Sequence, residues 1–270
     1  MRIFFCSLAT LLVVSCTSSS VKATSSDELN GGIAKTKFFS AIDRGDVESV
    51  SSLLNIGADV QWQDDSHNTP LIHAVENRQY AISKILIENG SQVNFAGNAG
   101  PAIVYAARNG DLQVIRLLLD SGADINSTLR YGNLPGGSSA VLESIIKNNF
   151  EVFSYLLSHG SDINRGTAIE YDGAALLLVG DLSAEAKDGT IAGDLKMLGL
   201  ILDNGFDVDQ EADYGSALSV AIRNHQVEAI KILMSHHANP DKIVKGIGLS
   251  SRQLAIKIED KEILEIIGKK

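Results

Sequence analysis

One phrase of nine residues recurs along most of this chain. It consists of two aliphatic residues, two polar residues, a glycine, a small residue, an acid or amide, a β-branched residue, and then Asn, Asp or Gln. Residues 118–126 show it faithfully, and residues 53–61 show it with Ile56 at a polar position. Its copies centre on Gly57, Gly90, Gly122, Gly160, Gly205 and His237, at intervals of 33, 32, 38, 45 and 32 residues. A period near 33 indicates one row of stacked units, although 270 residues would also allow two globular domains.

Each unit predicts a pair of short helices. Before Gly122, apolar residues recur at helical spacing at Leu112, Ile115 and Leu118, and Asp111 is a typical N-cap for that helix. Glycine after such a helix is typical of a left-handed residue that ends it. Sixteen positions before five of the centres lies a small residue, on a second predicted helix: Ala41, Ala74, Ala106, Ser144 and Ala221. A single pair cannot bury its apolar face, so we expect the pairs to stack, with small residues at the contacts.

These features resemble the ankyrin repeat. Residues 68–74, Asn-Thr-Pro-Leu-Ile-His-Ala, are similar to the family's TPLHxA-type opening, with Ile72 and His73 in exchanged order, and residues 106–126 are similar to its second half. The resemblance implies an all-α fold, an ankyrin-repeat solenoid of about seven stacked helix-turn-helix units with short hairpin loops. It covers an ankyrin repeat domain at 33–270, with repeats near 34–62, 63–95, 96–126, 127–164, 165–209, 210–241 and 242–270.

The repeats depart from the family pattern at two insertions and at both ends. Repeat four carries extra residues at 130–137, and repeat five carries a longer insertion at 180–193. Insertions in a solenoid lie in loops on one face, often the working face. The first repeat lacks the Thr-Pro turn and the last stops before its glycine, so we expect both to be polar caps.

The N-terminus indicates export and anchoring. Residues 1–15 form a signal peptide, with Arg2 before an apolar run that is too short to span a bilayer. Residues 13–16 resemble the lipobox of bacterial lipoproteins, which implies lipidation of Cys16; the alternative is a plain signal peptide cut elsewhere. Residues 16–32, rich in Ser and Thr, predict a flexible tether. We expect the protein to be anchored at the periplasmic face of the cell envelope. Thr17, directly after Cys16, favours anchoring in the outer membrane over the inner membrane.

Charge and cysteine content narrow the partners. The 23 basic and 33 acidic residues give a formal charge of −10, and loss of Arg2 with the signal peptide gives 22 − 33 = −11. This negative charge repels phosphate groups and anionic lipids, so we expect that the protein does not bind nucleic acid. For the same reason we expect it to contact the membrane only through its lipid anchor. Both cysteines lie in the first sixteen residues, so no disulfide is expected in the folded body.

Candidate chemical sites are weak. His236 and His237 form a pair without a third zinc ligand, and Asp203, Asp207, Asp209 and Asp213 lack the order and terminal Glu of a calcium loop. His73, on a predicted first helix, is expected to serve packing or hydrogen bonding. We therefore expect no catalytic residues, no metal, no cofactor and no enzyme activity.

The resemblance implies that another protein docks on the concave face, which is built from hairpin tips and the exposed edges of the first helices. The edge positions are Asp43, Arg44, Glu76, Asn77, Arg108, Asn109, Ile146, Lys147, Arg223 and Asn224. The tip positions are Asp65, Ser66, Asn68, Asn98, Arg130, Tyr131, Asn133 and Tyr214. Arginine and tyrosine are favoured interface anchors, so Arg108, Tyr131, Tyr214 and Arg223 are the sharper candidates.

Two functions remain open. The first is a membrane-anchored module that binds a basic periplasmic or envelope protein, because lipid-anchored ankyrin proteins include immunity factors that inhibit toxins. The second is a general envelope scaffold or stress-protective lipoprotein without a dedicated toxin partner. In either case we expect a monomer.

Overall fold

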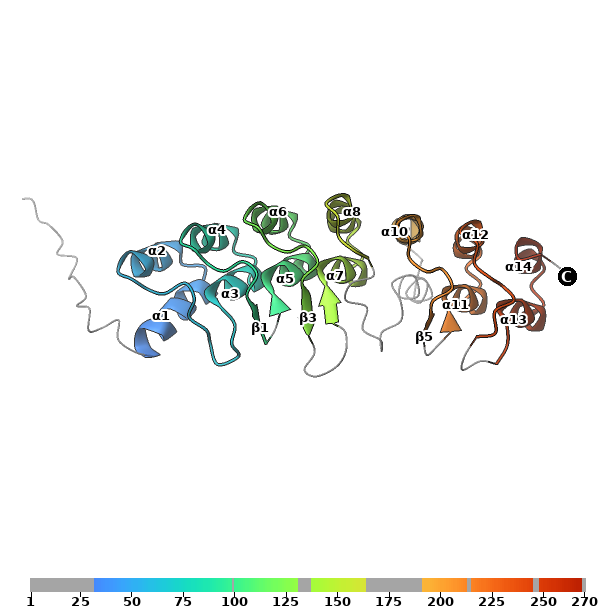
Figure 1. The fold of residues 1–270 in the computed structure, drawn as a ribbon, viewed down its shortest axis with the longest axis horizontal. Helices are drawn as coiled ribbons and strands as arrows, with labels where there is room; N and C mark the ends of the chain where they lie inside the picture. Colours follow the sequence, from blue (N-terminus) through green and yellow to red (C-terminus); the bar gives the residue numbers. More distant parts are fainter. Residues whose placement is uncertain are drawn as a thin grey trace, which may run out of the picture.

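The chain folds as a row of helix pairs. The computed structural model describes residues 32–98, 100–130, 137–163, 191–212, 215–244 and 248–268. The first helices of the pairs are α1 (Gly32–Asp43), α3 (Pro70–Glu76), α5 (Ala102–Asn109), α7 (Ala140–Ile146), α11 (Ala217–Arg223) and α13 (Ser251–Ile258). The second helices are α2 (Val47–Asn55), α4 (Tyr80–Glu88), α6 (Leu112–Asp120), α8 (Phe150–Ser158), α10 (Ile191–Asp203), α12 (Val227–Ser235) and α14 (Lys261–Ile266). Figure 1 shows the two sets as two parallel rows, which confirms the expected solenoid.

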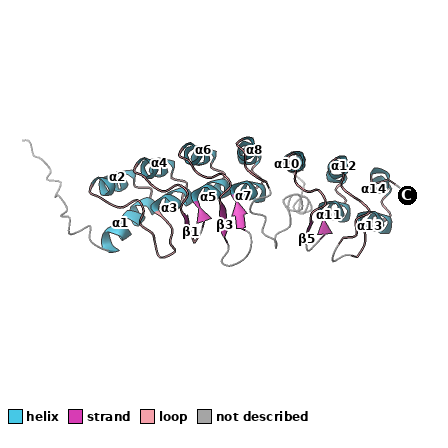
Figure 2. Cartoon of the chain, in the orientation of Figure 1, coloured by secondary structure: helices cyan, strands magenta, loops and turns pink. Residues whose placement is uncertain are grey.

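Short antiparallel hairpins precede several first helices (Figure 2). Strand β1 (Ala96–Gly97) pairs with β2 (Gly100–Pro101), β3 (Thr128–Arg130) with β4 (Gly137–Ser139), and β5 (Glu211–Ala212) with β6 (Gly215–Ser216). In register, Ala96 lies opposite Pro101 and Thr128 lies opposite Ser139. The insertion of repeat four at 130–137 thus begins at the last residue of β3 and ends at the first residue of β4, and residues 131–136 lie outside the described residues.

The helix ends follow the local signals in the sequence. The Asp111 carboxylate accepts a hydrogen bond of 3.0 Å from the Val114 N–H, and Thr69 caps α3 with Pro70 in its first turn. The residue two positions after the second helix has a left-handed backbone in all seven described units: Gly57, Gly90, Gly122, Gly160, Gly205, His237 and Gly268. The expectation that the last repeat stops before its glycine is therefore wrong, because Gly268 follows α14 in this position. At the first five positions glycine tolerates this backbone without cost, whereas His237, at φ 66°, adopts it against steric preference.

Exchanging these residue types should change stability in opposite directions. A Cβ added at Gly122, at φ 86°, would meet no atom within 4 Å, so Gly122→Ala introduces backbone strain alone and should lower the free energy of unfolding by about 1 kcal/mol. His237→Gly relieves the same backbone strain, but it also makes the unfolded chain more flexible, which offsets part of the gain. We therefore expect His237→Gly to raise the free energy of unfolding by about 0.5 kcal/mol. Urea unfolding of both variants measures this, and a loss of stability in both would contradict it.

The core runs between the two rows. The small residues of the first helices are buried, with Ala74, Ala106, Ser144 and Ala221 each 0% exposed. Phe38, Ile42 and Ile82 belong to a smaller cluster around the first two repeats. A larger cluster extends from Leu71 to Ile267, so the second to seventh units share one continuous apolar core.

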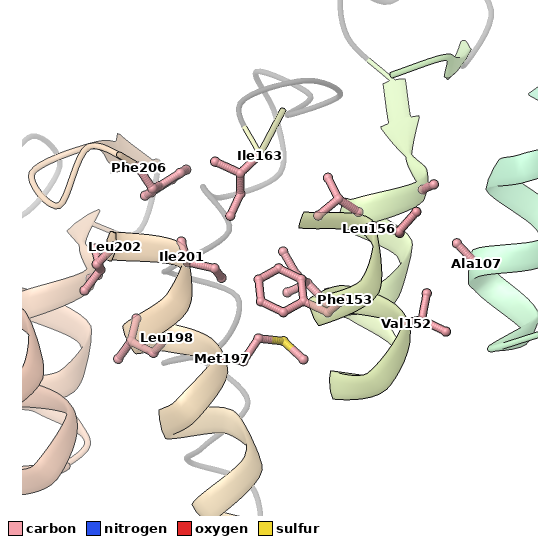
Figure 3. Packing of buried hydrophobic residues seen from close by; sticks show 14 of the residues in the cluster. Ala107, Val152, Phe153, Leu156, Ile163, Met197, Leu198, Ile201, Leu202 and Phe206 are labelled. Carbon is pink, nitrogen blue, oxygen red and sulfur yellow. The ribbon is translucent and has the colours of Figure 1, made fainter. Parts of the chain in front are cut away.

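The contact between α8 and α10 carries this core past a stretch that is not described. Figure 3 shows Phe153 of α8 facing Met197 and Ile201 of α10, with Leu156 and Ile163 beside them. Phe153, Leu156, Met197 and Ile201 are each 0% exposed. The helices on the two sides of residues 164–190 therefore pack directly against each other.

Several expectations lie outside the described residues. These are the signal peptide, Cys16, nearly all of the tether, the first helix of repeat five and most of the 180–193 insertion. At the ends of the described stack, α1 exposes Lys37 and α14 exposes Glu262, but Ile33 and Ile256 are 73% and 55% exposed. The first unit also exposes Val47 and Ile56, and the last unit also exposes Ile243, so neither end is the purely polar cap expected. No helix in the described part of the chain has both the length and the apolar character needed to cross a bilayer.

Candidate partner-binding surface

The described first helices α1, α3, α5, α7, α11 and α13 lie in one row on one side of the stack (Figure 1). We call this row, with the described loops that precede its helices, the first-helix surface; the first helix of repeat five lies outside the described residues. Asp43, Asn109, Ile146 and Arg223 are the last residues of α1, α5, α7 and α11, and Glu76 is the last residue of α3. The edge positions expected from the sequence thus recur at the same place in five units. A partner that docks along this surface would meet one such position in each of them.

At the first junction, Asp43 is part of a polar bridge between α1 and α3. Its carboxylate lies 3.1 Å from His73 Nδ1 and accepts a hydrogen bond of 3.4 Å from Asn77 Nδ2. His73 Nε2 lies 2.9 Å from Asp64, and the His73 ring meets Phe39 edge to face. Burial raises the pKa of Asp64, but hydrogen bonds from His73 and from the Asn68 N–H outweigh it and hold this pKa below its ordinary value.

A cavity of about 360 Å³ opens beside this bridge. Phe39, Asp43, Asp64 and Asp65 line it, together with Lys35 and other residues of α1. Asp43 and Asp65, which the sequence assigns to an edge and a tip, therefore share one concavity. Arg44, also an expected contact residue, is exposed just after α1, and its guanidinium donates a hydrogen bond to the Ser40 hydroxyl of that helix.

At the tip of repeat two, some of the predicted contact residues are exposed and one is buried. Asp65 and Ser66 are exposed, and Asn98 from the next tip lies 3.4 Å from His67 Nδ1. Asn68 is only 8% exposed, so the expectation that it contributes to the exposed tip is wrong. It packs beneath the following hairpin, where a Cβ at Gly97 would come within 2.7 Å of its Oδ1.

Arg108 is committed to an internal ion pair. Its Nε and Nη2 each donate to Glu143 on α7 at 3.0 Å, and its guanidinium lies 5.3 Å from the Tyr105 ring centroid. Glu143 is only 3% exposed. Burial raises the pKa of its carboxyl, but the hydrogen bonds and charge of Arg108 lower it below its ordinary value. The sequence reasoning missed Glu143, because its partner lies 35 residues away and no local pattern joins them.

Asn109 also bridges repeats, since its Nδ2 donates to the backbone carbonyls of Val75 and Glu76 at 3.0 Å each. Ile146 is 47% exposed, which is unusual for a large apolar side chain at a helix end. The remaining described edge residues are exposed as expected, namely Glu76, Asn77, Lys147, Arg223 and Asn224. Tyr131, Asn133, Tyr214 and the side chain of Arg130 lie outside the described residues.

The described residues offer little for metal chemistry. Within them, no three His, Cys, Asp or Glu side chains are grouped as metal ligands would be. His236 Nε2 instead pairs with Asp203 at 2.9 Å, while His237 is the left-handed residue after α12.

Comparison of the sequence with models of known protein families shows which family the chain belongs to. A family model of ankyrin repeats matches the chain in three copies, over residues 9–97, 38–129 and 98–167. The chain belongs to the ankyrin repeat family. Members of this family typically serve as non-enzymatic scaffolds for interactions between proteins.

Relatives of this ankyrin protein are distant and mostly larger. The ankyrin repeat and KH domain-containing protein mask-1 of Caenorhabditis elegans is 23% identical over 225 residues, which cover 82% of this chain and 8% of that protein. The ankyrin repeat protein FPV022 of Fowlpox virus is 25% identical, over 77% of this chain and 32% of its own length. The chain thus spans less than a third of these two relatives.

Among solved structures, the human ASB11 ankyrin repeat domain is similar, with a TM-score of 0.66 and 20% identity. The match covers 86% of this chain and 98% of that domain. It establishes the ankyrin fold for the stack as a whole.

Proposed function

We propose that this ankyrin protein is a membrane-anchored periplasmic module that binds another protein through its first-helix surface. The observation that carries the proposal is the row of exposed side chains at the ends of the first helices, above all Glu76, Ile146 and Lys147. A partly exposed isoleucine between polar side chains is the arrangement of an apolar contact with a polar rim. Arg108 and Asn109 support this surface from within the stack, and we assign them no direct contact.

The anchor is proposed from the sequence of residues 13–16, which resembles a lipobox. Several acyl chains on Cys16 would hold the protein stably at a membrane, since one chain alone binds only marginally. Cys16→Ala should move the protein from the membrane fraction to the soluble periplasmic fraction and abolish labelling with a fatty-acid analogue. Unchanged membrane fractionation with the variant would refute lipid anchoring.

For the partner, we propose a specific periplasmic effector toxin, which the protein would inhibit as an immunity factor. The net charge of −11 on the mature chain favours a basic partner, because opposite charge speeds encounter. Affinity purification of the tagged protein should then yield one stoichiometric basic protein, encoded beside this chain. The alternative is a general envelope scaffold, which would instead yield several envelope proteins in sub-stoichiometric amounts. If Ile146→Asp abolished co-purification of the single partner and Glu151→Lys on α8 did not, the partner would be assigned to the first-helix surface.

A further inference from the structure

The last described helix pair, α13 and α14, lies at the C-terminal end of the stack (Figure 1). In every other described first helix, the residue directly after the small residue is buried. These residues are at most 3% exposed: Ile42, Val75, Ala107, Ile145 and Ile222. Ile256 has the same position in α13, directly after the buried Ala255, but it is 55% exposed. The last pair therefore turns outward a position that the other pairs bury in the core.

The second helices show the same difference. The fourth residue after the N-cap is 0% exposed in α2, α4, α6, α8 and α12: Val50, Ser83, Ile115, Phe153 and Ile230. Its equivalent in α14 is Leu264, four residues after the N-cap Asp260, and this side chain is only partly buried. Ile256 and Leu264 thus occupy positions with which an internal pair holds the next pair. We call the outward side of α13 and α14, which carries these two residues, the end surface.

The first pair is closed against such a contact. Lys37 of α1 lies four residues before the small residue Ala41 and is exposed. In the other described first helices this position holds a buried residue: Pro70, Ala102, Ala140, Ala217 and Ser251. A repeat packed regularly before α1 would take the charge of Lys37 out of water, which would destabilise that contact.

Charges also oppose a second copy that continues the stack head to tail. Between the last two described pairs, Glu262 of α14 acts on Lys231 of α12, and Asp260 lies 3.0 Å from His225. A carboxylate therefore meets a basic side chain at both places. A head-to-tail copy would put like charges at the matching positions, which is unfavourable. The matching pairs are Glu265 with Glu48, and Glu259 with Asp46.

The charges of the last pair instead suit the same surface of a second copy. Helices α13 and α14 and the turn between them expose four charged residues that form no ion pair within the described residues: Lys257, Glu259, Lys261 and Glu265. A fifth exposed charge, Glu262, acts on Lys231. The four charges balance, although the whole chain carries −10. A two-fold axis places a surface against itself, so lysines of one copy can meet glutamates of the other.

We propose that two copies of this chain associate through their end surfaces, related by a two-fold axis. Ile256 and Leu264 of both copies form the apolar centre of this contact, and the four balanced charges form its polar rim. The dimer takes the place of the monomer expected from the sequence. Because α1 lies at the other end of the stack, the dimer carries two first-helix surfaces. Binding of two partner molecules rests on the proposed function, whereas the dimer itself does not.

Cysteine cross-linking in intact cells tests the dimer on the full-length chain and needs no partner. The natural cysteines are Cys6 and Cys16, so the chain without an added cysteine measures the background. With two differently tagged copies expressed together, Ile256→Cys should give one cross-linked band that contains both tags and has the summed mass. Lys37→Cys, at the other end of the stack, is the matched control and should give no such band. The double variant should give the same dimer without larger multiples.

The outcomes separate the possible occupants of the end surface. Monomer alone from Ile256→Cys, or a band that contains one tag and a different protein, would overturn the proposal. A ladder of larger multiples from the double variant would show a head-to-tail copy and would overturn it as well. Should Ile256→Cys not accumulate, sedimentation of the unmodified protein in a mild detergent decides instead. The mass of two chains is expected, and the mass of one chain would overturn the dimer.

Charge substitutions test the balance of the rim. Lys257→Glu together with Lys261→Glu leaves four negative charges on each copy, so the cross-linked fraction from Ile256→Cys should fall about tenfold. Lys37→Glu together with Lys84→Glu changes the net charge equally at exposed positions away from the end surface, and it should leave the fraction unchanged. An equal fall with both pairs of substitutions, or no fall with the first pair, would overturn the charged contact between two copies.

Discussion

Arg108→Leu should lower the free energy of unfolding by about 3 kcal/mol, because it leaves a buried carboxylate without its partner. Glu143 is 3% exposed and receives two hydrogen bonds of 3.0 Å from that guanidinium. The folded-state pKa of Glu143 is lowered, so the stabilisation is present above its ordinary value of 4.5 and is lost as pH falls through the folded value. Urea unfolding at about pH 7 and about pH 3.5 should therefore show a smaller difference from the unmodified protein in acid.

The double variant Arg108→Leu, Glu143→Leu is the control. Removing both charges takes away the desolvation cost along with the attraction, so the double variant should be within about 1 kcal/mol of the unmodified protein. If the single variant lost less than about 1 kcal/mol, Arg108 would be free to serve as a partner contact after all. The measurement thus separates the structural role of Arg108 from the anchoring role that its residue type suggests.

Phe153→Ala should lower the free energy of unfolding by about 4 kcal/mol, since it removes a large side chain from a fully buried site. Phe153 faces Met197 and Ile201 across the α8–α10 contact (Figure 3). That contact joins the first four repeats to the last three. We therefore expect the variant to unfold in two urea transitions where the unmodified protein unfolds in one, because repeat stacks lose cooperativity at a weakened interface.

Phe150→Ala is the matched control for this junction. Phe150 lies at the start of the same helix but is 38% exposed, so its loss should cost about 1 kcal/mol and leave a single transition. A single transition in Phe153→Ala as well would mean that the two halves of the stack do not depend on this contact for their cooperativity.

The fold could be predicted from the sequence because its signals are local and repeated. Asp111 and Gly122 bracket one helix within a dozen residues, and both perform the expected roles, as N-cap and as left-handed C′ residue. The positions of the edge residues followed from the same register. His237 shows that the register holds even where the sequence departs from glycine, since it adopts the same backbone.

The candidate site could be predicted less well, because it depends on contacts between repeats. Arg108 has the residue type of an interface anchor, but its partner Glu143 is supplied by the next repeat. Asn68 occupies a tip position, but the following hairpin covers it. His73 was expected to form hydrogen bonds, yet its two carboxylates come from a neighbouring helix and a neighbouring loop. Side-chain pairings of this kind depend on how neighbouring units are rotated against each other, which no single repeat encodes.

Site-specific photo-crosslinking in living cells tests the central claim most directly. A photoreactive amino acid replaces Glu76 or Ile146 on the first-helix surface, or the exposed Lys84 or Glu151 on the second helices as controls. Binding through the first-helix surface predicts one protein adduct of the same mass from Glu76 and Ile146, and none from Lys84 or Glu151. Adducts from the second helices alone, or equal adducts from all four positions, would contradict the account.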